Sequence, residues 1–208
     1  MPLTSENERT DHPEFVFIGE HPAVDFANTL VVSNGQLMDL LTSWPDLVDW
    51  LSQAELSTAP GLNVPASRGA AALKSVLELR EAWKDALAQI IDGGKVSDDF
   101  LERLNVHLNG DVFYETLQRN GKKEYRLVCS ASRLQGEKLA LAIVARQIAL
   151  FLAGANLSYL HRCANTASCV LYFYDTTKNH RRQWCSVATC GNRHKVAAFR
   201  ERRIKAGK

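Results

Sequence analysis

The sequence predicts an α+β protein in which helices predominate. A multihelical N-terminal domain with a small β-hairpin spans residues 1–157, and a small C-terminal module spans residues 158–208. Apolar residues recur at helical spacing through most of the first domain. Two segments on either side of an Asn-Gly pair are instead rich in aromatic and β-branched residues, as strands are. The last fifth of the chain holds four of the five cysteines, arranged as two close pairs.

The N-terminal segment predicts one short helix after a disordered start. Residues 1–12 are polar and without periodicity, so we expect them to be disordered. Residues 23–32 predict a helix that ends at Asn34-Gly35. Asp25 and Asn28 lie three residues apart and share one face of this helix. We expect both to be buried and hydrogen-bonded to backbone groups, the alternative being that they line a ligand pocket.

The middle of the chain predicts helices with marked N-terminal caps, one hairpin and a buried final helix. Serine caps and apolar stripes indicate helices that start at Ser43, Ser67 and Ser97 and end near residues 53, 91 and 108. Residues 111–117 and 124–129 predict a hairpin, since they flank Asn120-Gly121. Residues 135–160 predict a helix that is apolar almost all round. Such a helix belongs in the centre of a packed body, and here it leads directly into the cysteine-rich module.

Charge is distributed unevenly along the chain. The 208 residues are 46% hydrophobic and 23% charged, with a net charge of only +2, which is typical of a soluble globular protein. From residue 161 onward, however, eleven Lys/Arg stand against two Asp/Glu, whereas residues 1–160 hold 14 basic and 21 acidic side chains. This asymmetry indicates two functional parts, of which the basic one faces a polyanion. The N-terminal residues lack an apolar signal segment and no apolar run is long enough to cross a bilayer, so we expect a cytoplasmic protein without membrane contact.

The four C-terminal cysteines predict a metal site. Cys163 and Cys169 are separated by five residues, Cys185 and Cys190 by four, and the two pairs by fifteen. Two close pairs on either side of a hairpin-sized insert are typical of a four-thiolate site for one structural Zn²⁺. Four cysteines leave no open position for water, so the site is not expected to be catalytic. The fifth cysteine, Cys129, has no predicted role.

The arrangement of the module is expected to be treble-clef-like: a knuckle, a hairpin and then a helix whose first turn supplies a ligand. The knuckle carries the first cysteine pair, and the hairpin runs out through 171–174, turns at 175–179 and returns through 181–185. Cys190 is placed at the start of the last helix, with Ser186 or Thr189 as its cap. We expect a small core made by Trp184, Tyr172 or Tyr174, Val196 and Phe199.

The basic residues of the module form a candidate nucleic-acid-binding surface. On the last helix, Arg193 and Arg200 share one face and Lys195 and Arg202 another, with Val196 and Phe199 expected to pack inward between them. Arginine suits bidentate contact with phosphates or guanine edges. The full set of predicted contacts is Arg181, Arg182, Arg193, Lys195, Arg200, Arg202 and Arg203. The alternative is a solvated basic tail, or one that docks on the acidic body.

These residues carry a family resemblance. Cys190-Gly-Asn-Arg193 is the tetrapeptide after which CGNR zinc-finger proteins are named, and the surrounding pattern CAN…C…FYDTTKN…RRQWCS…CGNRHKVAAFRERR is similar to that finger nearly throughout. The segment Val24-Asp-Phe-Ala-Asn-Thr-Leu30 resembles the ABATE domain that precedes the finger in this family. One departure is the five residues inside the first cysteine pair, where four are usual. The resemblance implies a bacterial, stress-linked transcription regulator that binds DNA through the finger.

The leading hypothesis is therefore a non-enzymatic, zinc-stabilised DNA-binding regulator. Its N-terminal domain would sense a small molecule or mediate homodimerisation, as two-fold DNA sites require. The alternatives are an RNA-binding module, in which Tyr172 or Tyr174 stacks on unpaired bases, and a protein-interaction module whose basic helix docks on an acidic partner. An enzyme is not expected, because the chain shows no nucleotide-binding glycine loop, no nucleophile elbow and no paired catalytic carboxylates.

Overall fold

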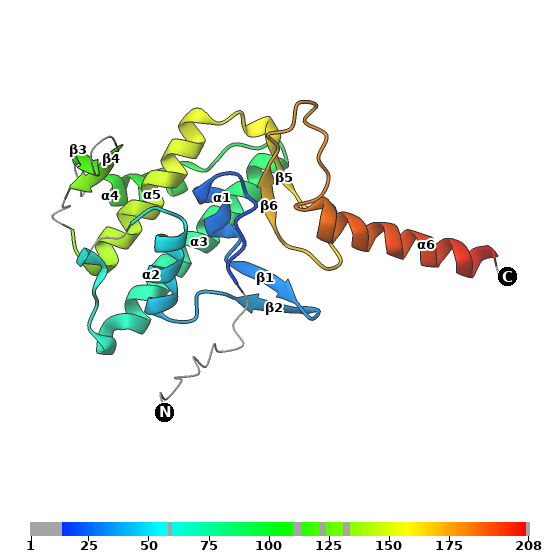
Figure 1. Ribbon diagram of the computed structural model, residues 1–208, viewed down its shortest axis with the longest axis horizontal. Helices are drawn as coiled ribbons and strands as arrows, with labels where there is room; N and C mark the ends of the chain where they lie inside the picture. The colour runs from blue at the N-terminus through cyan, green and yellow to red at the C-terminus, as the bar shows by residue number, and fades with distance from the viewer. Residues whose placement is uncertain (1–13, 58–59, 110–113, 121–123, 131–133, 207–208) are drawn as a thin grey trace.

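Figure 1 shows the computed structural model of the chain, which describes residues 14–57, 60–109, 114–120, 124–130 and 134–206. The expected disorder of residues 1–12 lies outside these ranges. The α+β class dominated by helices is confirmed. The helices are α1 (Pro22–Ala27), α2 (Trp44–Gln53), α3 (Ala66–Ile91), α4 (Asp98–Leu108), α5 (Gly136–Gly154) and α6 (Asn192–Ala206), with short helical turns η1 (Pro60–Leu62), η2 (Leu157–Tyr159) and η3 (Val187–Gly191).

In the part of the chain that the structure describes, strands occur as three separate antiparallel pairs. They are β1 (Leu30–Ser33) with β2 (Gln36–Asp39), β3 (Tyr114–Asn120) with β4 (Glu124–Ser130), and β5 (Leu160–Arg162) with β6 (Tyr172–Tyr174). The predicted hairpin at 111–129 is β3–β4, whose register runs from Tyr114 opposite Ser130 to Asn120 opposite Glu124. It lies at the opposite end of the molecule from α6 (Figure 1).

The main hydrophobic core lies between α3 and α5, with α1, α2 and α4 packed around them (Figure 1). Trp50, Trp83, Phe151 and Ile148 are among its fully buried side chains. The indole of Trp83 donates a hydrogen bond to the carbonyl of Ala23 at 2.7 Å, so its one polar atom is satisfied inside the core. The all-round apolar surface of α5 is explained by this central position. None of the described helices is both long enough and apolar enough to span a membrane.

The predicted helix caps at Ser43 and Ser97 are confirmed. Ser43 forms a capping box with Asp46, and the hydroxyl of Ser97 accepts a hydrogen bond from the Phe100 N–H. The cap expected at Ser67 is wrong, because α3 already begins at Ala66 after Pro65 and has no side-chain cap. The residue before this helix is a proline, whose backbone is suited to the position just outside a helix.

The helix expected over residues 23–32 is wrong in its second half. It ends at Ala27, and the chain then forms the β1–β2 hairpin, in which Val31 lies opposite Met38. Asn34 and Gly35 both have positive φ angles, 51° and 78°, as a tight hairpin turn requires. The β-branched Val31 and Val32 before this Asn-Gly pair were the signal for a strand.

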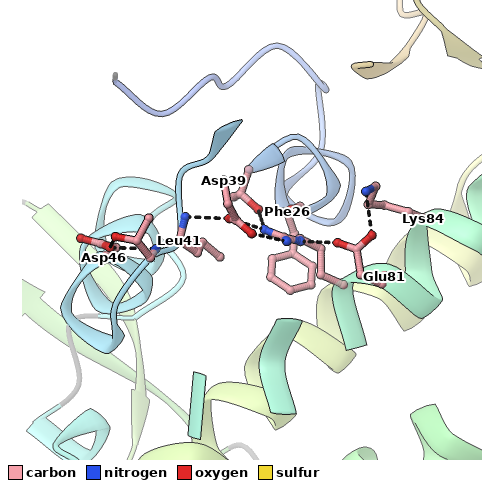
Figure 2. Close-up of polar contacts among 9 residues, drawn as sticks. Phe26, Asp39, Leu41, Asp46, Glu81 and Lys84 are labelled. Carbon is pink, nitrogen blue, oxygen red and sulfur yellow. Dashed lines mark hydrogen bonds and ion pairs between the residues drawn. The ribbon is translucent and has the colours of Figure 1, made fainter. Parts of the chain in front are cut away.

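A partly buried ion pair attaches this hairpin to α3. The guanidinium of Arg80 is bidentate on Asp39, with N–O distances of 2.7 and 2.6 Å, and Nη1 also donates to the Thr29 hydroxyl. Its Nε contacts Glu81, which in turn pairs with Lys84 (Figure 2). Because all of these groups are paired, the buried Arg80 holds the hairpin in one orientation against the helix.

The connection from the body to the C-terminal module is not the continuous helix that was expected. α5 ends at Gly154, and Ala155 is already extended. Asn156 then caps the η2 turn by accepting a hydrogen bond from the Ser158 N–H, and the chain enters β5. The first cysteine therefore follows a strand rather than a helix.

Candidate metal centre and nucleic-acid interface

The four predicted cysteine ligands converge on one point. The Sγ atoms of Cys163, Cys169, Cys185 and Cys190 all lie within 4.8 Å of one another, and all four residues are buried. The Sγ atoms of Cys169 and Cys185 are 3.6 Å apart, and those of Cys185 and Cys190 are 3.5 Å apart. Zinc bound tetrahedrally by four thiolates at about 2.3 Å has sulfur–sulfur separations of roughly 3.8 Å. The cluster therefore fits one structural Zn²⁺.

Local backbone contacts position each ligand. The N–H of Cys163 bonds to the carbonyl of Leu171, and the N–H of Cys185 points at the Sγ of Cys163 at 3.5 Å. Cys190 lies in η3, which is capped as expected by Ser186, whose hydroxyl accepts from the Thr189 N–H. Gly191 packs against the Trp184 ring, where an added Cβ would lie 3.5 Å from the nearest ring atom.

The acidity of the thiols indicates why the cluster needs a cation. The hydrogen bond from the Cys185 thiol lowers the pKa of Cys169 to about 5, so one thiolate forms readily. The same contact raises the pKa of Cys185, and burial raises that of Cys190. Four buried sulfurs cannot all ionise together without a compensating charge, and a divalent metal ion supplies it.

The hairpin expected between the cysteine pairs is wrong in its pairing. β6 pairs with β5, so that Leu160 lies opposite Tyr174, and residues 181–185 form no strand. This return segment is held by the fully buried Asp175 instead. Its carboxylate accepts hydrogen bonds from the N–H and hydroxyl of Thr177 and from the N–H of Arg182. Burial raises the pKa of Asp175, but these hydrogen bonds outweigh it and hold the pKa below its usual value.

Arg182, a predicted nucleic-acid contact, is used within the fold. Its guanidinium donates to the carbonyls of Trp184 and Cys185, pairs with Glu20 at 3.4 Å, and lies 4.5 Å above the centre of the Phe173 ring. It therefore holds the segment that carries a zinc ligand, and we set it apart from the interface. Its neighbour Arg181 is exposed.

The remaining basic residues lie on α6, which extends away from the rest of the molecule and contacts the module mainly through η3 (Figure 1). The side chains of Arg193, Lys195, Arg200, Arg202 and Arg203 are all exposed. Val196 and Phe199 do not pack inward as expected, since they are 49% and 55% exposed. The core of the module is formed by Leu171 and Phe173 together with Val31 and Leu40 of the body, and Trp184 packs against it as expected.

Two family models match the chain. The ABATE model, described as "Putative stress-induced transcription regulator", matches residues 20–155, and the CGNR zinc finger model matches residues 159–203. The first match alone covers more than half of the chain.

The chain belongs to the ABATE family.

Comparison with curated proteins found no significant match. The C-terminal module is thus the CGNR finger, and Cys163, Cys169, Cys185 and Cys190 bind its Zn²⁺.

The ABATE domain and the CGNR finger share a buried interface. The side chain of Asn28, at the end of α1, donates to the carbonyl of Tyr172 at 2.9 Å and accepts from its N–H at 2.8 Å. Asp25 accepts from the N–H of Gly19, and the carbonyl of Gly19 accepts from the N–H of Tyr174 in β6. Asp25 and Asn28 of the Val24–Leu30 motif thus serve backbone groups, as expected. Their link to the finger had no sequence signal, since Asn28 and Tyr172 are 144 residues apart.

A groove runs between the knuckle, residues 164–168, and the N-terminal half of α6; we call it the knuckle groove. The positive edge of the groove is formed by Arg193 and Arg200. The rest is lined by apolar side chains together with hydrogen-bonding ones, among them Asn165, Ser168, Thr189 and Asn192. The side-chain nitrogen of Asn165 is buried and has no hydrogen-bond partner among the described residues.

Proposed function

We propose that this ABATE-family protein is a cytoplasmic transcription regulator that binds DNA through α6 of its zinc-stabilised CGNR finger. The observation that carries the proposal is the exposure of five basic side chains on a helix that extends away from the body (Figure 1). Among the described side chains, none of these five forms an ion pair. Unpaired cations concentrated on one projecting element favour binding to a polyanion.

The metal centre supports the proposal by giving α6 a rigid base. Cys190 lies in η3, which leads directly into the helix, so the position of the first turn depends on zinc coordination. The closed four-thiolate site suits this structural role, and the proposal includes no catalytic activity.

The ABATE domain supplies the input in this proposal, either by binding a small molecule or by forming a dimer. The contact of Asn28 with the backbone of Tyr172 joins the ABATE domain to the finger. A change in the position of α1 would therefore displace β6 and the adjacent metal centre. The description of the ABATE family as a transcription regulator agrees with this division into input and output.

A salt titration of DNA binding tests the proposal. The logarithm of the association constant for duplex DNA is expected to fall linearly with the logarithm of salt concentration, with a slope of about −5 if the five cations of α6 and Arg181 each neutralise one phosphate. Fluorescence anisotropy with a labelled duplex and zinc-loaded protein measures this slope.

The matched variants replace two exposed cations each. Arg193→Ala/Arg200→Ala should flatten the slope by about 2, whereas Lys74→Ala/Lys95→Ala, on the ABATE domain, should leave it unchanged. Binding that is independent of salt, or equally weakened by both pairs, would contradict the proposal.

A further inference from the structure

We propose that α6 is a recognition helix for the major groove of duplex DNA, in which Val196 and Phe199 contact thymine methyl groups while basic rows on both sides bind the two phosphate backbones. This inference rests on the proposed DNA-binding function and adds the form of nucleic acid, the groove and the residues that select sequence.

The residues of α6 are segregated into parallel rows. At about 100° per residue, Arg193 and Arg200 form one row and Lys195 and Arg202 form another, roughly 160° away around the helix. Val196 and Phe199 lie between the two rows; we call them the apolar ridge. On one half of its surface the helix therefore presents a basic row, a middle stripe that holds the apolar ridge together with Asn192 and Arg203, and a second basic row.

The apolar ridge is not explained by packing. Both of its side chains are about half exposed, in a helix that is otherwise strongly polar. Phe199 and Val196 line a shallow hollow together with Lys195, Arg200 and Arg203, and the guanidinium of Arg203 lies 6.0 Å from the centre of the Phe199 ring. Phosphate binding alone has no use for large apolar side chains at the centre of the basic face. Base edges do, because thymine presents a methyl group in the major groove.

The dimensions of α6 match that groove. A helix of 15 residues is about 22 Å long and about 10–12 Å wide with its side chains, and the major groove is about 12 Å wide. With the ridge facing the bases, the two basic rows point toward the opposite groove walls. The knuckle groove lies beside the Arg193–Arg200 row.

The same geometry disfavours RNA. The major groove of an A-form duplex is too deep and narrow for side chains to read. Of the two tyrosines expected to stack on unpaired bases, Tyr172 is buried in the body core. Tyr174 packs against Phe151, and its hydroxyl accepts a hydrogen bond from the Asn156 N–H. The two tyrosines that suggested RNA binding are therefore engaged in the fold.

Removal of thymine methyl groups tests the inference. Duplex sites are first selected from a random pool with the zinc-loaded full chain, and each thymine of the selected site is then replaced by uracil, which lacks the methyl group. Wild-type protein should lose about tenfold in affinity at one or two of these positions. Val196→Ala/Phe199→Ala should bind the thymine site about as weakly as wild type binds the uracil site, and should no longer distinguish the two.

Arg193→Ala/Arg200→Ala is the matched variant. It should weaken binding to thymine and uracil sites equally, because phosphates carry no sequence information. Since the ridge side chains are exposed, both double variants should keep one zinc per chain and the wild-type unfolding temperature, which establishes that the changes in binding are local.

Three results would overturn the inference. If wild type binds duplex DNA with the expected salt dependence but tolerates uracil everywhere, or if the ridge variant still discriminates thymine from uracil, the proposed function survives and the ridge assignment fails. If structured RNA of equal length displaces the duplex at lower concentration than unlabelled duplex does, the major-groove assignment fails. If wild type binds no duplex at all, and α6 binds only an acidic protein, both the major-groove assignment and the proposed DNA-binding function fail.

Discussion

Replacement of Asn28 tests whether the ABATE domain and the CGNR finger form one cooperative structure. Asn28 is 1% exposed, and its amide is hydrogen-bonded to both backbone groups of Tyr172. Asn28→Ala would leave the N–H and the carbonyl of Tyr172 buried without partners. Each unsatisfied buried group costs about 1–3 kcal/mol, so we expect the free energy of unfolding to fall by about 2–5 kcal/mol. Total stabilities are about 5–15 kcal/mol, which makes this a severe loss.

Urea unfolding of the zinc-loaded protein, followed by circular dichroism, measures the effect. Asn63→Ala is the matched control, because Asn63 is exposed and lies outside helices and strands, and it should change stability by less than about 0.5 kcal/mol. Because Tyr172 follows Cys169 by three residues, Asn28→Ala should also speed the transfer of zinc to a chelator. An unfolding curve for Asn28→Ala that overlays those of wild type and Asn63→Ala would refute the proposed coupling.

Three further predictions concern ionisation, the metal and an arginine. Burial raises the pKa of Asp25 to about 6, so the fold favours its neutral form. The contribution of Asp25 to the free energy of unfolding should fall by up to about 3 kcal/mol as pH rises from 4 to 6. Urea unfolding of wild type and Asp25→Asn across this range measures the effect, because the difference between their free energies of unfolding should change by that amount. A difference that stays constant with pH would exclude it. Cys163→Ser should lower bound zinc well below one ion per chain by atomic absorption, whereas Cys129→Ser should retain it, and equal zinc contents would argue against the ligand set. Arg182→Ala should lower the unfolding temperature of the finger, whereas Arg181→Ala should leave it unchanged and weaken DNA binding. If Arg182→Ala instead weakens DNA binding without lowering the unfolding temperature, Arg182 is a DNA contact.

The metal centre was predictable because its determinants are local. The spacing of Cys163, Cys169, Cys185 and Cys190 needs only the chemistry of zinc to be interpreted, and Ser43 and Ser97 cap helices through hydrogen bonds within four residues. Such signals are contained in a short stretch of sequence and do not depend on the rest of the fold.

The errors arose where distant contacts decide the outcome. The expected partner of β6 was the segment 181–185, but β6 pairs with residues 160–162. The sequence does not indicate this pairing, because it depends on how the finger packs against the body. The apolar pattern of Val196 and Phe199 predicted a buried face, and only the projection of α6 from the molecule shows that they are exposed. Arg182 was indistinguishable from Arg181 in the sequence, although the structure uses its guanidinium to hold the Cys185 segment.

The contribution of α6 to DNA binding can be measured most directly by shortening the chain. A protein that ends at His194 keeps all four cysteines and the contact between the Trp184 and His194 rings, 5.7 Å apart, but lacks the projecting part of the helix. We predict that it binds one zinc ion, unfolds at the wild-type temperature and loses at least a hundredfold in affinity for duplex DNA, as expected on removal of several phosphate contacts. If the zinc-loaded, shortened protein binds the duplex as tightly as the full chain, α6 is not the DNA-binding element and the account is wrong.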